Sequence, residues 1–134
     1  MALTIKRTVK QMVADANNEV EEVSISDAKE LVGDNSVLFV DVRDIREVSK
    51  TGRVSGARHV PRGMLEMWID PDTRYHRAFF AESKKFIFYC AGAWRSALAA
   101  KTAQDMGLSP VAHLQGGLSA WIEAGGPIDP PKDR

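Results

Sequence analysis

The sequence predicts a three-layer α/β fold, in which a mostly parallel central sheet carries helices on both faces. Largely apolar runs at residues 37–42, broken by Asp41, and at residues 86–89 and 111–114 are typical of buried strands. Segments in which apolar residues recur at helical spacing separate these runs. Strands that alternate with helices in this way build a parallel sheet that is covered on both sides.

The first part of the chain is predicted to form two helices around a short edge strand. Apolar residues at helical spacing predict a helix over residues 7–16, and an edge strand is expected over residues 22–25. Ser26 is a suitable N-cap for a second helix over residues 27–31, and Gly33 is expected to end it.

The segment after the first central strand has a weaker pattern. Residues 43–56 are polar and rich in turn-forming residues, so no regular element is predicted there. Residues 57–60 are expected to form a short strand that Pro61 closes. A short helix is predicted over residues 63–69.

The last third of the chain continues the alternation of strands and helices. A helix is predicted over residues 94–106, with Gly107 in the position that ends it. After the third central strand, Gly116 and Gly117 are expected to turn the chain into a final helix over residues 118–124. The carboxyl ends of the strands, where sites form in such sheets, then carry Asp41 and Cys90.

The length and charge of the chain limit the classes of protein to which it can belong. With 134 residues, we expect an N-terminal helical extension over residues 1–19, one domain over residues 20–130 and a polar tail over residues 131–134. The formal net charge is zero, so no global field would attract a nucleic acid or a membrane, and neither is expected as a partner.

Targeting signals and metal-binding patterns are not evident in the sequence. The N-terminal residues lack the apolar core of a signal peptide, and no apolar run approaches the length of a membrane span. A single cysteine forms no internal disulfide, and a free thiol suits a reducing cytoplasmic setting. The histidines are scattered, so no metal site is expected.

The cysteine lies in the most informative segment, FIFYCAGAWRS. Cys90 follows an apolar strand and precedes small residues and a predicted helix. The N–H groups and the positive dipole end of a helix N-terminus favour a thiolate and bind anions. No Asp or Glu occurs from residue 83 to residue 104, whereas Arg95 lies close by. We therefore interpret Cys90 as a nucleophilic thiolate in an anion-binding loop.

A structural interpretation of these residues has to be weighed against the catalytic one. A lone cysteine is most often a small buried apolar residue without chemistry. The small residues that follow Cys90 permit close approach of the backbone, which a structural cysteine does not need. The combination of strand, small-residue loop, arginine and helix therefore favours a catalytic cysteine.

Two further groups of charged residues are candidates for supporting roles. Asp41, Arg43 and Glu47 could tune the site, but a buried ion network that fixes the loop before Gly52 is the favoured interpretation. Arg58, in a second stretch without acidic residues, could recruit an anionic donor or belong to a solvated basic face.

The motifs together resemble the rhodanese-like domain of sulfurtransferases. The first matching block begins with Asp41-Val42-Arg43, includes Glu47 and continues through the segment GRVSGARHVP. The second block is the loop CAGAWRS, and the third runs from LQGG to the tripeptide GGP. The sequence departs from the family pattern at Arg53, where histidine is usual, and at Ala93, where glycine is common.

The resemblance implies that a sulfane sulfur is carried on Cys90 as a persulfide, with no other cofactor. The expected donor is thiosulfate or a similar small anion, and the expected acceptor is a thiol, cyanide or a partner protein. Arg95 would hold the donor and favour the thiolate. Ser96 is expected to cap the helix. The remaining expected substrate-binding residues, together with Ser96, are Ala91, Gly92, Ala93 and Trp94.

Two other functions remain open at this point. Phosphatases and arsenate reductases with related folds place five residues between cysteine and arginine, whereas four residues separate Cys90 from Arg95 here. The shorter loop suits one sulfur atom better than a tetrahedral phosphate. A sulfur carrier or a persulfide-binding regulatory module that serves a dedicated protein would keep the same loop.

Overall fold

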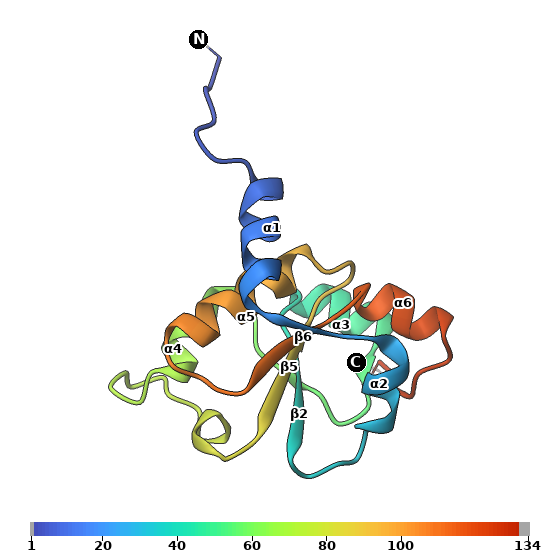
Figure 1. Cartoon of the computed structure of the whole chain (residues 1–134). Helices are drawn as coiled ribbons and strands as arrows, with labels where there is room; N and C mark the ends of the chain where they lie inside the picture. The colour runs from blue at the N-terminus through green and yellow to red at the C-terminus, as the bar shows by residue number, and fades with distance from the viewer. Residues whose placement is uncertain (1, 132–134) are drawn as a thin grey trace.

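The computed structural model describes residues 2–131 and has the predicted three-layer α/β architecture (Figure 1). Five parallel strands form the central sheet in the order β1-β6-β5-β2-β4. These strands are β1 (Glu21–Val23), β2 (Val37–Asp41), β4 (Arg58–His59), β5 (Lys85–Tyr89) and β6 (Val111–Leu114). Two short strands, β3 (Arg53–Val54) and β7 (Ile128–Asp129), form a separate antiparallel pair.

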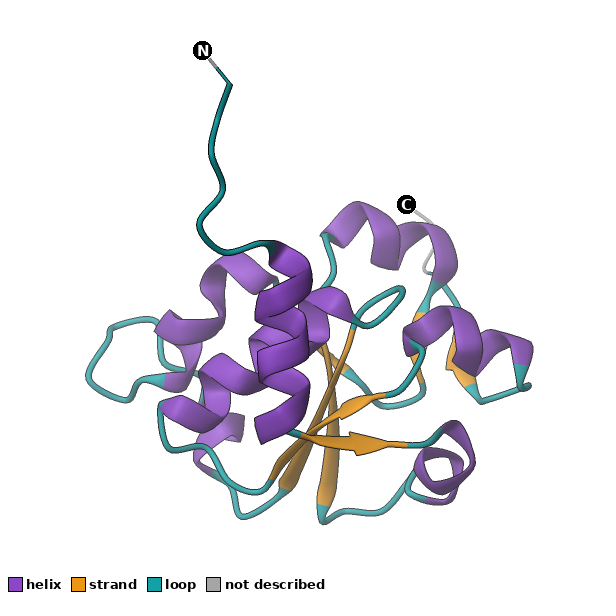
Figure 2. Cartoon of the chain, turned by 45° about the horizontal axis from the view of Figure 1, so that its top comes forward, coloured by secondary structure: helices purple, strands orange, loops and turns teal. Residues whose placement is uncertain are grey.

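Helices cover both faces of the sheet, as the alternating pattern predicts (Figure 2). They are α1 (Val9–Glu19), α2 (Ile25–Glu30), α3 (Ile45–Thr51), α4 (Leu65–Ile69), α5 (Trp94–Asp105) and α6 (Gly117–Glu123). Helices α4 and α5 pack on one face of the sheet, and α2 and α6 pack on the other. Each face buries its own apolar core, since alternate residues of the central strands point to opposite sides.

Helix α1 packs on α5 rather than on the sheet. Val13 and Ala16 of α1 bury their side chains against Ala97 of α5, with Leu98 at the edge of this contact. A capping box begins the helix, because Thr8 accepts a hydrogen bond from the N–H of Gln11, whose side chain accepts one from the N–H of Thr8. The helix predicted over residues 7–16 is therefore present, but it runs from Val9 to Glu19 and docks on α5.

Several predicted boundaries are wrong. Helix α2 begins at Ile25 and is capped by Ser24, not by Ser26. The helix predicted over residues 63–69 is a 3₁₀ turn (Arg62–Met64) followed by α4. A second 3₁₀ turn (Ala78–Ala81) precedes β5. Of the predicted tail over residues 131–134, all but residue 131 lies outside the described residues.

The segment predicted to be irregular contains helix α3, which is the main error of the sequence analysis. Asp44 caps α3, and its carboxylate accepts a hydrogen bond from the N–H of Arg46. Glu47 completes a capping box by accepting from the N–H of Asp44. The helix escapes an apolar-pattern search because Val48 is its only buried residue.

A buried ion pair between Asp41 and Arg43 holds α3 against the sheet. Nη2 of Arg43 lies 2.7 Å from a carboxylate oxygen of Asp41, and the two side chains are 2% and 0% exposed. The guanidinium also donates to the Thr51 hydroxyl at 2.8 Å and to the Gly52 carbonyl at 2.6 Å. Burial alone lowers the pKa of Arg43, but the hydrogen bonds and charge of Asp41 outweigh it, so the pKa rises.

The part of the chain that the structure describes contains no helix long and apolar enough to cross a membrane.

We expect Asp41→Asn to lower the free energy of unfolding by about 3–5 kcal/mol, because it leaves the buried Arg43 without its counter-charge. Urea denaturation followed by circular dichroism measures the change. Asp15→Asn, which breaks the exposed ion pair with Arg7, is the control and should have little effect. Equal stability of the two variants would show that the buried pair does not hold this region.

Candidate active site

Cys90 lies where the sequence analysis predicts, on the loop between β5 and α5. It directly follows the last residue of β5, at the carboxyl edge of the sheet. Its side chain is 1% exposed, and the sulfur lies 3.6 Å from the hydroxyl oxygen of Ser96. Gly92 and Trp94 form the exposed part of the loop, and Trp94 is 53% exposed. The thiol therefore lies beneath a loop whose rim is open to solvent.

Helix α6 fixes the loop from the opposite side. The N–H of Leu118 donates to the carbonyl of Cys90 at 2.8 Å, and the N–H of Ser119 donates to the carbonyl of Ala91 at 3.1 Å. Gly117 has a φ of +65°, and a Cβ there would lie 2.6–2.7 Å from these two carbonyl oxygens. Only glycine permits this close approach.

The loop carbonyls thus point to α6, while the loop N–H groups remain available. Among the described backbone hydrogen bonds, none uses the N–H of Ala91, Gly92 or Ala93. The first N–H groups of α5 also lack partners within the helix. Successive free N–H groups next to the positive end of a helix dipole form a site for an anion.

Ala93 adopts a backbone conformation that favours glycine. Its φ is 157° and its ψ is −8°. A residue with a Cβ held in such a conformation costs on the order of 1–3 kcal/mol, which the surrounding structure has to offset. The departure from the family pattern at this position therefore places alanine in a glycine-like geometry.

Ser96 does not cap helix α5, contrary to the prediction. The helix begins at Trp94, and Ala93 occupies the N-cap position without a side-chain hydrogen bond. Ser96 lies inside the first turn, is 0% exposed, and its hydroxyl donates to the carbonyl of Ala93 at 3.1 Å. The hydroxyl oxygen of Ser96 also accepts a hydrogen bond from the thiol of Cys90, so Ser96 contacts the sulfur directly.

Arg95 is paired with Glu47. The local sequence around Cys90 contains no acidic residue, but the carboxylate of Glu47 comes from a distant segment and lies beside the loop. Two hydrogen bonds of 2.7 and 3.0 Å join the guanidinium to the carboxylate. The bonds from Arg95 are the main cause of the lowered pKa of Glu47, and those to Glu47 are the main cause of the raised pKa of Arg95. The thiol of Cys90 contributes to the raised pKa of Arg95 as well. Glu47 is therefore the bound partner of Arg95 in this structure.

The profile of the rhodanese-like domain matches residues 24–124, most of the chain. The chain belongs to the rhodanese-like domain family. Helix α1 and strand β1 both lie before the matched residues.

Similar proteins carry different descriptions. A protein of unknown function from Rhodopseudomonas palustris, described as a possible tyrosine phosphatase, has 53% sequence identity and a TM-score of 0.94; the match covers 96% of this chain and 99% of that chain. A mouse protein described as thiosulfate sulfurtransferase/rhodanese-like domain-containing protein 3 is 26% identical over 75% of this chain and 67% of its own length.

A tRNA uridine(34) hydroxylase from Brucella suis is 27% identical over 92% of this chain. The chain spans 41% of the length of that relative. The solved thiosulfate sulfurtransferase of Pseudomonas aeruginosa shares the fold, with a TM-score of 0.69 and 22% identity over 94% of this chain and 23% of that chain.

The supporting residues of the rhodanese-like domain separate into distinct places. Asp41 and Arg43 form the buried pair described above, in agreement with the structural interpretation. Glu47 does not belong to this pair and instead forms an ion pair with Arg95. Arg58 lies on the edge strand β4, where its guanidinium is stacked 5.1 Å from the centre of the Phe79 ring. It lines a separate pocket there.

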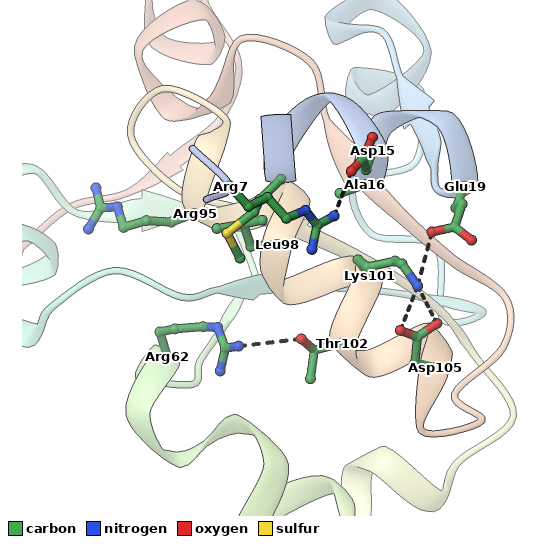
Figure 3. A pocket seen from close by; sticks show the side chains of 11 residues that line it. Arg7, Asp15, Ala16, Glu19, Arg62, Arg95, Leu98, Lys101, Thr102 and Asp105 are labelled. Carbon is green, nitrogen blue, oxygen red and sulfur yellow. Dashed lines mark hydrogen bonds and ion pairs between the residues drawn. The ribbon is translucent and has the colours of Figure 1, made fainter. Parts of the chain in front are cut away.

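A cavity of about 500 Å³ lies beside the active-site loop, between α1 and α5 (Figure 3). Arg95 is at its edge, and its guanidinium points away from the other labelled side chains. Lys101 binds Glu19 and Asp105 there, and Arg7 binds Asp15. The charges that line this cavity are therefore mostly paired with one another.

The contacts that three residues near the loop make are not predicted from the sequence. The role of Glu47 could have been found from the spacing of Asp44 and Glu47, which is that of a capping box and predicts a helix before Gly52. Gly117 is predicted to form a turn, and the structure adds its close approach to the carbonyls of Cys90 and Ala91. His113 is 0% exposed, and Nδ1 of its ring lies 3.4 Å from Oγ of Ser96.

We expect Gly117→Ala to displace the Cys90 loop, because the added Cβ would meet the carbonyl oxygens of Cys90 and Ala91. The variant should unfold at lower urea concentration and lose most of the reactivity of Cys90 with iodoacetamide. Gly125→Ala is the control, since it also has a positive φ but has open space around its Cβ position. If Cys90 in Gly117→Ala reacts with iodoacetamide as fast as in the wild type, the role assigned to this glycine is wrong.

Proposed function

We propose that this chain is a sulfurtransferase that moves a sulfane sulfur from thiosulfate or a similar anionic donor to a thiol or cyanide through a persulfide on Cys90. The observation that carries the proposal is the six-residue loop from Cys90 to Arg95. It places one thiol beneath backbone N–H groups that have no backbone acceptor in the described structure. The proposal includes a reducing, cytoplasmic setting, in which the thiol stays free.

The two steps of the reaction use the same sulfur. The Cys90 thiolate attacks the outer sulfur of thiosulfate, a new S–S bond forms, and the bond inside thiosulfate breaks with its electron pair leaving on sulfite. The acceptor thiolate or cyanide then attacks the outer sulfur of the persulfide, and Cys90 leaves as a thiolate. This is covalent catalysis, and no electrons are needed from outside.

The surroundings of Cys90 fit a bound persulfide. The N–H groups of Ala91, Gly92 and Ala93 can donate to a terminal sulfur that carries negative charge. The contact between Ser96 and the Cys90 sulfur fixes the direction of the thiol side chain. Arg95 can exchange part of its bond with Glu47 for a bond to the anionic donor, because both side chains are partly exposed.

A phosphatase is the second candidate, because the Rhodopseudomonas palustris protein with 53% identity is described as a possible tyrosine phosphatase. The loop with four residues between cysteine and arginine, however, suits one sulfur atom better than a tetrahedral phosphate. Turnover of aryl phosphates that exceeds sulfur transfer would favour the phosphatase. A sulfur carrier that serves one partner protein would also form the persulfide but would transfer its sulfur to small acceptors slowly.

We expect treatment with thiosulfate to add the mass of one sulfur atom to the intact protein, in a form that cyanide or dithiothreitol removes. Cys90→Ser should neither gain this mass nor transfer sulfur, because a serine hydroxyl is a far weaker nucleophile at neutral pH. Intact-protein mass spectrometry measures the adduct, and circular dichroism checks the fold. An unmodified wild-type protein, or sulfur transfer by Cys90→Ser, would overturn the covalent mechanism.

We expect Arg95→Ala to raise the half-saturating concentration of thiosulfate by about tenfold or more, since a charged hydrogen-bonding partner is lost. Glu47→Gln should have the opposite effect, because it removes the carboxylate that competes with the donor for Arg95. Steady-state sulfur transfer to cyanide measures both. Arg46→Ala, on the same helix as Glu47, is the control. If Glu47→Gln impairs donor use as much as Arg95→Ala, the pair only positions the loop.

A further inference from the structure

Polar side chains form a continuous chain from the buried thiol to the junction of α1 and β1. The Cys90 sulfur lies 3.6 Å from Oγ of Ser96, which lies 3.4 Å from Nδ1 of His113. Nε2 of His113 lies 2.7 Å from Oδ1 of Asn17. Cys90, Ser96 and His113 are at most 1% exposed, whereas Asn17 is exposed. This row of polar side chains thus connects the thiol with the surface on the side of α1.

The partners of His113 determine how its ring can act. Because the amide oxygen of Asn17 accepts, Nε2 carries the proton in the neutral ring, and Nδ1 is left as an acceptor towards Ser96. Ser96 has one hydroxyl proton, which can point to the carbonyl of Ala93 or to Nδ1. A small rotation of this hydroxyl completes the path from sulfur to imidazole.

The charges around His113 come from few groups. Register places Glu22 of β1 and Phe88 of β5 beside it in the sheet. Within the described residues, Glu22 is the charged group that faces the ring, with Oε2 3.8 Å from Nε2. Burial is the main influence and lowers the pKa of His113, while the charge of Glu22 opposes this shift. Burial thus favours the neutral ring, whose Nδ1 is left as an acceptor by the contact of Nε2 with Asn17.

We propose that His113, acting through Ser96, takes up the proton of the Cys90 thiol and returns it when the cysteine is released. His113 is a positioning residue that stores this proton, and Ser96 conducts it. The inference rests on the nucleophilic role of Cys90 given by the proposed function.

The proton transfer is balanced without any added group. The S–H bond of Cys90 breaks with its electron pair staying on sulfur, and the proton passes to Oγ of Ser96. The hydroxyl proton of Ser96 passes at the same time to Nδ1 of His113. The products are a thiolate and an imidazolium, which stabilise each other, and the carboxylate of Glu22 lies next to the imidazolium. After sulfur transfer, the same steps run in reverse.

Helix α1 gains a role in the site from this arrangement. Asn17 belongs to α1, which precedes the residues matched by the family profile. Its amide fixes the proton on Nε2 and thereby leaves Nδ1 free to accept. A helix outside the matched residues therefore orients a side chain inside them.

The first test measures the thiolate without using sulfur transfer. The chain has one cysteine, so the ultraviolet absorbance of the thiolate and the rate of alkylation by iodoacetamide both report on Cys90. We expect His113→Asn, which keeps a polar group near Nδ1 but takes no proton, to be alkylated about tenfold more slowly at neutral pH. Its alkylation profile should move to higher pH. A profile that superimposes on that of the wild type would overturn the proposal.

A double-variant cycle separates a relay from a packing effect. Ser96→Ala should slow alkylation to a similar extent as His113→Asn, and the double variant should be no slower than either single variant. Asn17→Ala should give a smaller shift in the same direction, whereas Asn18→Ala, at the next position on α1, should leave the profile unchanged. Effects of Ser96→Ala and His113→Asn that multiply in the double variant would contradict a shared path.

A measurement with the wild-type ring covers the case in which the His113 variants do not fold. Nitrogen NMR should show the proton on Nε2, and the titration of His113 should shift when Cys90 is replaced in Cys90→Ser. A His113 titration that is identical in both proteins would overturn the coupling. If the wild type forms the persulfide but His113→Asn is alkylated at Cys90 as fast as the wild type, the relay is wrong and the proposed function stands. If the alkylation rate of Cys90 depends on His113 but thiosulfate never produces a persulfide, the proposed function is wrong and the relay stands.

Discussion

The buried ion pair between Asp41 and Arg43 sets the position of the elements around the site. The side chain of Arg43 extends from the end of β2 to Thr51 and Gly52 at the C-terminal end of α3. One guanidinium therefore connects the strand to the end of this helix. The helix in turn presents Glu47 to Arg95, which lies 48 residues later in the chain. A charge pair below the surface thereby determines which partner the arginine of the loop has before any donor arrives.

The Cys90 loop is held from beneath by two helices, and each of them makes a different kind of contact with it. Helix α6 takes up the carbonyls of Cys90 and Ala91, which leaves the N–H groups of the loop for an anion. Helix α5 contributes Ser96 beneath the thiol. This division suits a reaction in which negative charge appears on sulfur at one face of the loop and the proton leaves through the other.

Much of the fold could be predicted because it depends on local patterns. The strands β2, β5 and β6 are apolar runs, and the glycines after α5 and α6 mark helix ends. Helix α3 was missed because its apolar positions are few and Ile45 is exposed. The pairing of Arg95 with Glu47 and the contact of His113 with Asn17 join distant segments, and no local pattern encodes such contacts.

The docking of α1 on α5 has a practical consequence for work on this protein. A fragment cut at the limits of the family match would begin at residue 24 and lack both α1 and strand β1. Ala97 and Leu98 would then face water, and His113 would lose the amide that orients its ring. Kinetic constants measured on such a trimmed fragment would describe a different acid–base environment from that of the whole chain.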